Sequence, residues 1–380
     1  MKASDPGNTL NAPLRIGLVF GTRPEVIKLY PLWSALQPYV ATGKVDVSAI
    51  STGQQRELLA QGLGFFGWTP EYEFDLMRDG DELAAMHARI LSSLACLYRD
   101  EHFDWIVVQG DTLTAWTAAM AAFYARIPVA HVEAGLRTWD PEHPFPEEVH
   151  RRWITACATL HFCPTEAARR NLLAEGTSPR DVLLVGNTVV DAVRLVSDRI
   201  ESPAPRLSHA PRRLFLTVHR RENHSRLVKD ILPAIKRVVR EAPDVEVVVS
   251  VHPNPAVREP LLRQLGGLDR VQLMPPLSYG ATLGLVRDST LVVTDSGGLQ
   301  EEAAVLGTPV MVLRRVTERI EAVRAGNALV IGTDVGQVAG HILEIVKDDH
   351  RLGQMARPSD VFGDGHAAER IAALLAGDGG

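Results

Sequence analysis

The chain alternates short apolar runs with longer amphipathic stretches over nearly its whole length. The runs are rich in Val, Ile and Leu, as is typical of strands buried on both faces of a parallel sheet. In the first half they fall at Arg15–Phe20, Val45–Ser51, Trp105–Gln109, Pro128–His131 and, more weakly, Leu160–Phe162. In the second half they fall at Leu214–Val218, Val245–Val251, Val271–Met274, Leu291–Thr294 and Pro309–Leu313.

The stretches between the runs carry apolar residues at helical spacing, as at Glu82–Tyr98, Ser225–Glu241 and Gly297–Leu306. Alternating strands and helices build right-handed βαβ units. A chain of 380 residues exceeds one ordinary core. The pattern therefore predicts an α/β protein with two doubly wound domains that face a central cleft.

The two series of runs are separated by Asp198–Arg213, a proline-rich segment without a long apolar run. We place the linker just before it, near Gly186–Asn187, so that the helix expected at Thr188–Ile200 joins the second domain. This predicts an N-terminal domain of residues 14–186 plus 364–380 and a C-terminal domain of residues 187–363. Ligands of doubly wound domains bind at the carboxyl ends of the strands, so we expect the functional residues there.

Composition narrows the function. With 46% hydrophobic and 23% charged residues, the chain is neither disordered nor collagen-like. A net charge of −6 argues against a nucleic-acid or membrane surface. No apolar run reaches the ~18 residues of a membrane span, and Met1–Pro13 lacks the apolar core of a secretion signal. Cys96, Cys157 and Cys163 match neither a disulfide framework nor a zinc site, so we expect a cytoplasmic protein without a metal.

The first strand is followed by Gly21-Thr22-Arg23-Pro24-Glu25 and by a helix that carries Lys28. Pro24 suits the first turn of that helix. Arg23 and Lys28 would add two cations to the backbone donors of a helix start, and such a place suits an anion. A solvated helix start capped by proline is the alternative.

Three carboxylates are expected on the same face of the first domain. Asp111 and Glu133 each follow a strand, and Glu147 follows a loop rich in proline and charge at residues 139–146. Any one of them could be a helix cap or a surface charge. Three that converge must be paired or used, which is typical of an acid/base site.

In the second domain, His219 ends a strand beside Arg220 and Arg221, where it could transfer a proton or bind a phosphate near neutral pH. A lone histidine in such a place is more often structural. The most specific pattern is Asp295-Ser296-Gly297-Gly298, where a strand ends, two glycines admit close backbone approach and a helix begins. We expect this loop to cradle a pyrophosphate, with Glu302 one turn later at a ribose.

The sequence lacks the P-loop motif of nucleotide triphosphate sites and the nucleophile motif of α/β-hydrolases, because it contains no GxxxxGK[ST] and no GxSxG pattern.

Together the segments at the strand ends resemble the non-hydrolysing UDP-N-acetylglucosamine 2-epimerases, in family order over most of the chain. The matching segments are Phe20-Gly21-Thr22-Arg23-Pro24-Glu25 with Lys28, Gly110-Asp111-Thr112, His131-Val132-Glu133-Ala134-Gly135-Leu136-Arg137-Thr138, Pro146-Glu147-Glu148, Gly186-Asn187-Thr188, His219-Arg220-Arg221-Glu222-Asn223, Thr294-Asp295-Ser296-Gly297-Gly298 with Gln300-Glu301-Glu302, and Thr317-Glu318-Arg319 with Glu321-Ala322-Val323.

The resemblance implies two Rossmann-like domains in the GT-B arrangement, with a last helix at His366–Leu375 that crosses back to the first domain. It also implies a homodimer and a reaction that needs no cofactor. By position, it implies a sugar and diphosphate site of Arg23, Lys28, Asp111, Glu133, Glu147, Arg151 and His219. It likewise implies that Ser296, Gly297, Gly298 and Glu302 hold the pyrophosphate and ribose, with Arg319 close by.

The implied reaction inverts C2 of UDP-GlcNAc to give UDP-ManNAc, through elimination of UDP to a 2-acetamidoglucal and its re-addition. The C2 proton becomes acidic only as the C1–O bond breaks, so the site must stabilise departing UDP and supply a base and an acid. We assign C2 proton transfer to Asp111 and Glu133, assisted by Glu147 and His219. Which carboxylate is base and which is acid is left open.

Two segments depart from the family pattern. Gln55 stands where members often carry histidine, and Gly80 stands where they carry arginine. Those positions help bacterial members bind a second UDP-GlcNAc as activator, so we expect no sigmoidal kinetics. The uracil-contact loop at Pro276-Leu277-Ser278-Tyr279 matches the family pattern only loosely.

Three other functions are the alternatives to a non-hydrolysing epimerase. They are a GT-B glycosyltransferase, a hydrolysing epimerase that releases ManNAc, and an inactive nucleotide-sugar sensor.

Overall fold

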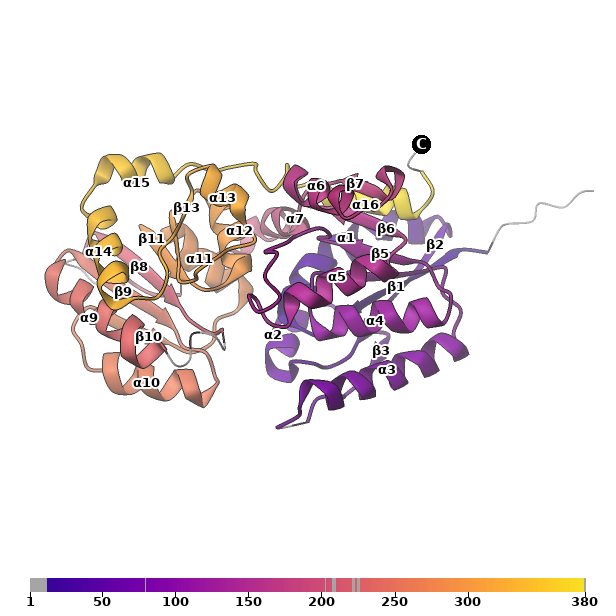
Figure 1. The fold of residues 1–380 in the computed structure, drawn as a ribbon, viewed down its shortest axis with the longest axis horizontal. Helices are drawn as coiled ribbons and strands as arrows, with labels where there is room; N and C mark the ends of the chain where they lie inside the picture. Colours follow the sequence, from indigo (N-terminus) through magenta and orange to yellow (C-terminus); the bar gives the residue numbers. More distant parts are fainter. Residues whose placement is uncertain are drawn as a thin grey trace, which may run out of the picture.

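A computed structural model describes residues 12–78, 80–201, 203–206, 210–220, 223 and 226–378. Within these residues, two parallel sheets lie side by side along the long axis of the molecule, and helices cover both faces of each (Figure 1). The first sheet has the order β3-β2-β1-β4-β5-β6-β7, and the second has the order β10-β9-β8-β11-β12-β13. The predicted class, with two doubly wound units, is confirmed.

The first sheet is built around β1, which pairs in parallel with β2 and β4. Its strands are β1 (Leu14–Phe20), β2 (Val45–Ser51), β3 (Tyr72–Glu73), β4 (Trp105–Gln109), β5 (Val129–Val132), β6 (Leu160–Cys163) and β7 (Val182–Leu184). Its helices are α1 (Arg23–Ala41), α2 (Arg56–Phe66), α3 (Leu83–Asp100), α4 (Leu113–Tyr124), α5 (Glu147–Cys157) and α6 (Glu166–Ala174). The sequence did not predict β3 and β7, because strands of two or three residues carry no recognisable periodicity.

The second sheet repeats this plan around β8, which pairs with β9 and β11. Its strands are β8 (Arg212–Thr217), β9 (Val245–Ser250), β10 (Val271–Met274), β11 (Leu291–Thr294), β12 (Val310–Val312) and β13 (Ala328–Val330), the last of which was not predicted. Its helices are α9 (Leu232–Glu241), α10 (Pro255–Leu265), α11 (Tyr279–Asp288), α12 (Gly297–Leu306), α13 (Ile320–Arg324), α14 (Val335–Val346) and α15 (Asp349–Met355). A π-helical turn, Leu227–Ile231, leads into α9, and Ser225 of the predicted helix lies outside the described residues.

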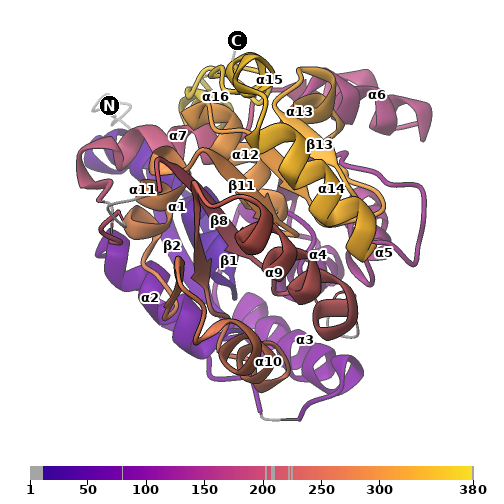
Figure 2. The same ribbon diagram turned by 90° about the vertical axis from the view of Figure 1, so that its left-hand side faces the viewer.

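Two helices lie at the junction of the halves, α7 (Thr188–Leu195) and α16 (Ala367–Leu375). Helix α7 packs against α1 of the first half and α12 of the second, so it belongs to both cores, and α16 packs against α1 and α7. Figure 2 shows α7 and α16 beside α1 and α12 at the top of the molecule. Helix α7 ends earlier than predicted, and a 3-10 turn at Ser197–Arg199 follows it.

The chain crosses between the halves twice at one point. Gly186 and Gly363 have positive φ angles of 96° and 114°. A Cβ added to Gly363 would lie 2.9 Å from Cα of Gly186, so glycine is required for this close approach. Asn187 N donates to Phe362 O at 2.7 Å. The crossing lies at the predicted linker, although the domain boundaries themselves remain a prediction.

Candidate functional site

Two buried cations and two buried carboxylates meet between the two sheets. Lys28 Nζ of α1 contacts Glu133 Oε2 and lies 2.8 Å from Glu301 Oε2 of α12. Arg319 Nη2 donates to Glu133 Oε1 at 3.0 Å, and its Nε donates to Glu301 Oε1 at 2.8 Å. Each cation thus touches one carboxylate from each half. We call these four residues the interdomain square.

Glu133 is held by further donors. Gln109 Nε2, at the end of β4, lies 3.0 Å from Glu133 Oε2, and Asn187 Nδ2 lies 3.5 Å from the same atom. The backbone of Glu133 has a φ of 66°, a left-handed conformation that is uncommon outside glycine and that places the side chain in the cleft. Burial raises the pKa of Glu133, although Lys28 opposes that shift.

Asp111 follows β4 and is paired with a buried cation. Its Oδ2 contacts Nη2 of Arg151, and Nδ1 of His150 lies 3.0 Å from its backbone oxygen. Burial alone would raise the pKa of Asp111, but the positive charges of Arg151 and Arg319 outweigh it and lower this pKa. Asp111 is therefore ionised at neutral pH.

Glu147 is the first residue of α5. The environment of its carboxyl group differs from that of Asp111. Among the described residues, its buried Oε2 has no hydrogen-bond partner. Burial, together with the negative charge of Asp111, raises the pKa of Glu147 to about 7. Asp111 and Glu147 thus form a pair of carboxyl groups whose pKa values are displaced in opposite directions, as in acid/base sites.

The start of α1 is tied to the loop that carries Asp111. Glu25 accepts hydrogen bonds from Gly21 N at 2.9 Å, from Thr22 N at 2.8 Å and from Thr112 Oγ1 at 2.6 Å. Burial raises its pKa to about 7. Arg23, the next predicted cation, reaches across the cleft, where its Nη1 donates to Leu277 O at 3.0 Å.

Asp295 organises the loop that carries His219. It accepts from His219 N at 3.1 Å, from Arg220 N at 3.0 Å and from Asn223 Nδ2 at 2.9 Å. Nδ1 of His219 lies 3.2 Å from Asp295 Oδ1. Burial lowers the pKa of His219 despite that carboxylate, so the ring is neutral at pH 7. Arg221 and Glu222 of the matching segments lie outside the described residues.

The Ser296–Gly298 turn begins α12 as predicted, and the Ser296 side chain caps the helix. A Cβ on Gly297 would lie 3.1 Å from the Arg319 guanidinium, whereas one on Gly298 would meet nothing within 4 Å. The turn is therefore packed on one side and open on the other. Glu302, one turn later, is buried, and burial beside Glu301 raises its pKa to about 7.

The structure brings Lys28, Asp111, Glu133, Arg151 and Arg319 into the contacts given above, and it places Glu147 close enough to Asp111 for their charges to interact. Several partners of these residues were not predicted as site residues. They are Gln109, Glu148, Glu301 and Glu318. Three of them occur within the matching segments, but a motif does not show which side chain faces inwards.

Within the described ranges, no group of three or more His, Cys, Asp or Glu residues could hold a metal ion. None of the helices in those ranges is long and apolar enough to cross a membrane.

Comparison with known proteins gives relatives along the whole chain. Residues 39–376 match the family model described as UDP-N-acetylglucosamine 2-epimerase. The UDP-N-acetylglucosamine 2-epimerase of Yersinia pestis is 41% identical over 95% of this chain and 98% of its own length. The enzyme of that name from Escherichia coli K12 is 38% identical over the same shares of the two chains.

Solved structures of similar proteins superpose on this chain over most of its length. The UDP-GlcNAc 2-epimerase of Neisseria meningitidis, bound to UDP-GlcNAc, superposes with a TM-score of 0.90 at 35% identity over 95% of this chain and 99% of that one. The enzyme of Methanocaldococcus jannaschii, in complex with UDP-GlcNAc and UDP, gives a TM-score of 0.84 at 30% identity over the same shares. The fold, the order of the cleft residues and these relatives together establish that the chain belongs to the UDP-N-acetylglucosamine 2-epimerase family.

Proposed function

We propose that this protein interconverts UDP-GlcNAc and UDP-ManNAc by inverting the configuration at C2. The relatives named above support this activity, and the Neisseria meningitidis structure contains UDP-GlcNAc. The observation that carries the proposal is the pair of Asp111 and Glu147, because two carboxyl groups with oppositely displaced pKa values suit proton removal and proton return.

In the proposed reaction, the C1–O bond breaks, UDP leaves, and a base takes the C2 proton to give a 2-acetamidoglucal. UDP then re-forms the bond at C1 while an acid returns a proton to the opposite face of C2. Asp111, ionised, removes the proton in one direction, and Glu147, protonated, delivers it. The two exchange roles in the reverse direction, so the pair carries one proton in the free enzyme, and both carboxyl groups are protonated at the glucal intermediate.

We propose a supporting role for Glu133. From the sequence, we assigned proton transfer to Asp111 and Glu133 and an assisting role to Glu147 and His219. Lys28, Arg319 and Gln109 occupy both of its oxygens, and such a carboxylate is a poor proton carrier. Its charge fixes Lys28 and Arg319 in the cleft instead. His219, neutral and more than a third exposed, is free to donate to a phosphate.

The departing UDP needs positive potential around its phosphates. We propose that the N-terminus of α12 at Ser296–Gly298 supplies backbone donors and that Arg23 and Arg319 supply charge. The open side of Gly298 supports this placement. Glu302 lies one turn further, where its carboxyl group suits the ribose hydroxyls. Neither a metal nor a nicotinamide is required for this chemistry.

We further propose that the protein acts as a homodimer in the cytoplasm. Three aromatic residues of α4 and α5 are 48–68% exposed, namely Phe123, Tyr124 and Trp153, and such a surface suits burial against a second copy. The free cysteines Cys96, Cys157 and Cys163 suit a reducing compartment. Light scattering on the purified protein tests the dimer, and a monomeric mass would overturn that part.

The activity is tested by incubating the protein with UDP-GlcNAc alone and following the products by NMR. Accumulation of UDP-ManNAc without an acceptor is the expected result. Free ManNAc with stoichiometric UDP would identify a hydrolysing epimerase instead. Turnover that appears only after an acceptor is added would identify a glycosyltransferase, and UDP binding without turnover would identify a sensor.

A further inference from the structure

Glu148, the second residue of α5, is a fully buried carboxylate next to Glu147 in the chain. Its Oε2 accepts from Thr138 N at 3.0 Å, and its Oε1 accepts from Trp139 N at 3.1 Å. Oε2 also accepts from Arg151 Nη1 at 3.1 Å. Glu148 therefore uses both oxygens in hydrogen bonds, to two backbone amides and to Arg151, and its Oε1 also lies 3.8 Å from Nε of Arg152.

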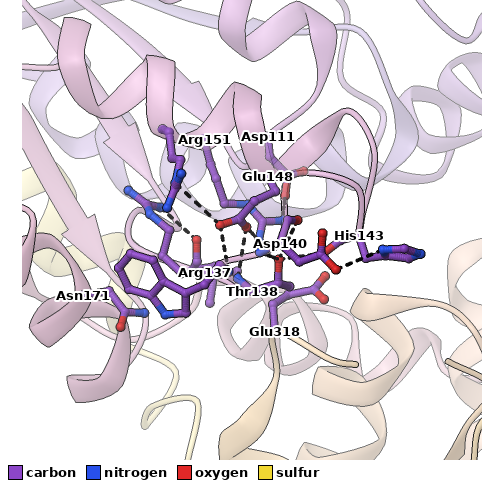
Figure 3. A network of polar contacts seen from close by, with 12 residues as sticks. Asp111, Arg137, Thr138, Asp140, His143, Glu148, Arg151, Asn171 and Glu318 are labelled. Carbon is purple, nitrogen blue, oxygen red and sulfur yellow. Dashed lines mark hydrogen bonds and ion pairs between the residues drawn. The ribbon is translucent and has the colours of Figure 1, made fainter. Parts of the chain in front are cut away.

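The guanidinium that binds Glu148 also binds Asp111. Arg151 contacts Glu148 through Nη1 and Asp111 through Nη2, so one planar cation joins the two carboxylates, and its side chain is 2% exposed (Figure 3). The fork of an arginine fixes direction as well as distance. The position of Asp111 relative to α5 thus depends on how Glu148 holds Arg151.

The two amides belong to the segment that leads to Glu147. Thr138 Oγ1 donates to His143 O at 2.6 Å, and Glu148 N donates back to Pro144 O at 3.1 Å. Trp139 has a φ of 66°, which turns the chain sharply at the anchored amide. The segment from 138 to 146 therefore closes on itself around the Glu148 carboxylate, as Figure 3 shows from close by.

We propose that Glu148 is a positioning residue for the epimerisation: its carboxylate anchors the 138–146 segment and orients Arg151, and so sets Asp111 and Glu147 on their respective faces of the sugar ring. This inference rests on the proposed function. Glu148 lies too deep to touch the substrate, and it acts through Arg151 and through the backbone of Thr138 and Trp139.

Substitution of Glu148 by Gln removes the charge and keeps the shape. Its amide group would face a backbone N–H, so one of the two anchored amides would lose its acceptor. Arg151 would keep Asp111 as its hydrogen-bonded carboxylate, with the charge of Glu318 also nearby. Displacements of about 1 Å in such groups reduce turnover roughly 100-fold without weakening binding as much.

The experiment measures kcat, KM and UDP affinity for E148Q, E148D and the matched control E175Q. Glu175 accepts hydrogen bonds of 2.9 and 2.6 Å from Nε and Nη2 of Arg137. It lies 3.8 Å from Nε of Arg152, which lies equally far from Glu148, but among the described residues it has no ion pair with Arg151. For E148Q we expect kcat to fall by about 10- to 100-fold, with KM and UDP affinity within about threefold. E148D, which keeps the charge on a shorter stem, should recover part of that loss, and E175Q should keep wild-type kcat.

A purely structural role predicts a different outcome. If kcat per folded molecule is unchanged in E148Q, or if E175Q loses as much turnover as E148Q, the proposal is overturned. A double-mutant cycle with R151K gives a second test, because E148Q should reduce kcat less in R151K than in the wild type if part of its effect acts through Arg151. Fully multiplicative losses would contradict the route through Arg151, and R151K with E148D keeps the test possible if E148Q does not fold.

Hydrogen exchange separates this proposal from the proposed function. In E148D and E148Q, the amides of Thr138 and Trp139 should exchange faster than in the wild type and in E175Q, whether or not UDP-GlcNAc is the substrate. If the wild type converts no UDP-GlcNAc but these amides lose protection, the anchoring stands and the proposed function falls. Unchanged protection in both variants overturns the anchoring.

Discussion

Arg319 of the second half donates a 3.0 Å hydrogen bond across the cleft to Glu133 of the first half. The same guanidinium binds Glu301 and Glu318, so replacing Arg319 with Met would leave three buried carboxylates short of a cation. We expect R319M to lower the free energy of unfolding by about 3–5 kcal/mol. Urea denaturation measures this. Arg237→Met, which removes an exposed ion pair with Glu241, is the control and should change little.

Asp111 and Glu147 should each be indispensable for chemistry and dispensable for UDP binding. D111N and E147Q keep the shape of the side chain and remove its ability to carry a proton. We expect each to reduce kcat by at least about 100-fold. Deuterium exchange at C2 measures the chemistry, and calorimetry measures UDP affinity.

Substitution of Glu133 should affect the chemistry less than substitution of Asp111 or Glu147. E133Q should retain slow C2 exchange, because its proposed task is to hold Lys28 and Arg319. Full loss of exchange in E133Q together with normal exchange in E147Q would restore the assignment made from sequence.

The pH profile should show an alkaline limb. The active pair carries one proton, on Asp111 or Glu147, and the pKa of Glu147 is raised to about 7, whereas that of Asp111 is lowered. As pH rises through about 7, the free enzyme loses that proton, so kcat/KM should fall in both reaction directions. The negative charge of bound UDP-sugar raises the pKa of Glu147 further, and the limb in kcat should lie at higher pH. A kcat/KM that keeps rising up to pH 9 would contradict the pairing.

Glu302 should limit stability at alkaline pH. Its folded-state pKa of about 7 lies above the unfolded value, so the folded protein holds its proton more tightly and loses stability as pH rises from about 4.5 to 7. E302Q removes this penalty and should raise the free energy of unfolding above pH 7 by about 1–3 kcal/mol. The same change should weaken UDP binding if Glu302 holds the ribose. If E302Q is no more stable than the wild type at pH 8, Lys28 and Arg23 already compensate the negative charge of Glu302.

The dependence of rate on UDP-GlcNAc should be hyperbolic. Gln55 caps α2 without a side-chain hydrogen bond, and Gly80 offers no side chain at all. Neither supplies the charge that the family pattern has at these positions. Initial rates over a wide concentration range should give a Hill coefficient of about 1. A clearly sigmoidal curve would show that other residues form an activating site.

Much of the fold could be predicted because its strands are buried. Runs such as Val45–Ser51 and Trp105–Gln109 match β2 and β4 residue for residue, since strands covered on both faces are rich in apolar residues. Short edge strands such as β7 lack that contrast with their surroundings. Helix α7 serves both halves, which no periodicity reveals, because apolar residues on two faces look alike in one dimension.

The sequence predicted most residues of the site, but it predicted their roles less well. Motif order placed Lys28, Glu133 and Arg319 together, but it did not show that Gln109 donates to Glu133 or that Glu301 shares Lys28 and Arg319 with it. The opposite environments of Asp111 and Glu147 arise because Arg151 of α5 forms an ion pair with Asp111, whereas Oε2 of Glu147 is buried without a hydrogen-bond partner among the described residues. Such differences in neighbours decide pKa values, and they exist only after folding.

The most direct measurement is one NMR time course of the protein with UDP-GlcNAc in D₂O. We expect UDP-ManNAc to appear with deuterium at C2 and the remaining UDP-GlcNAc to become labelled at C2 as the reaction returns. D111N and E147Q should show neither change. UDP-ManNAc that retains its C2 proton, or no conversion at all, would contradict proton transfer by Asp111 and Glu147.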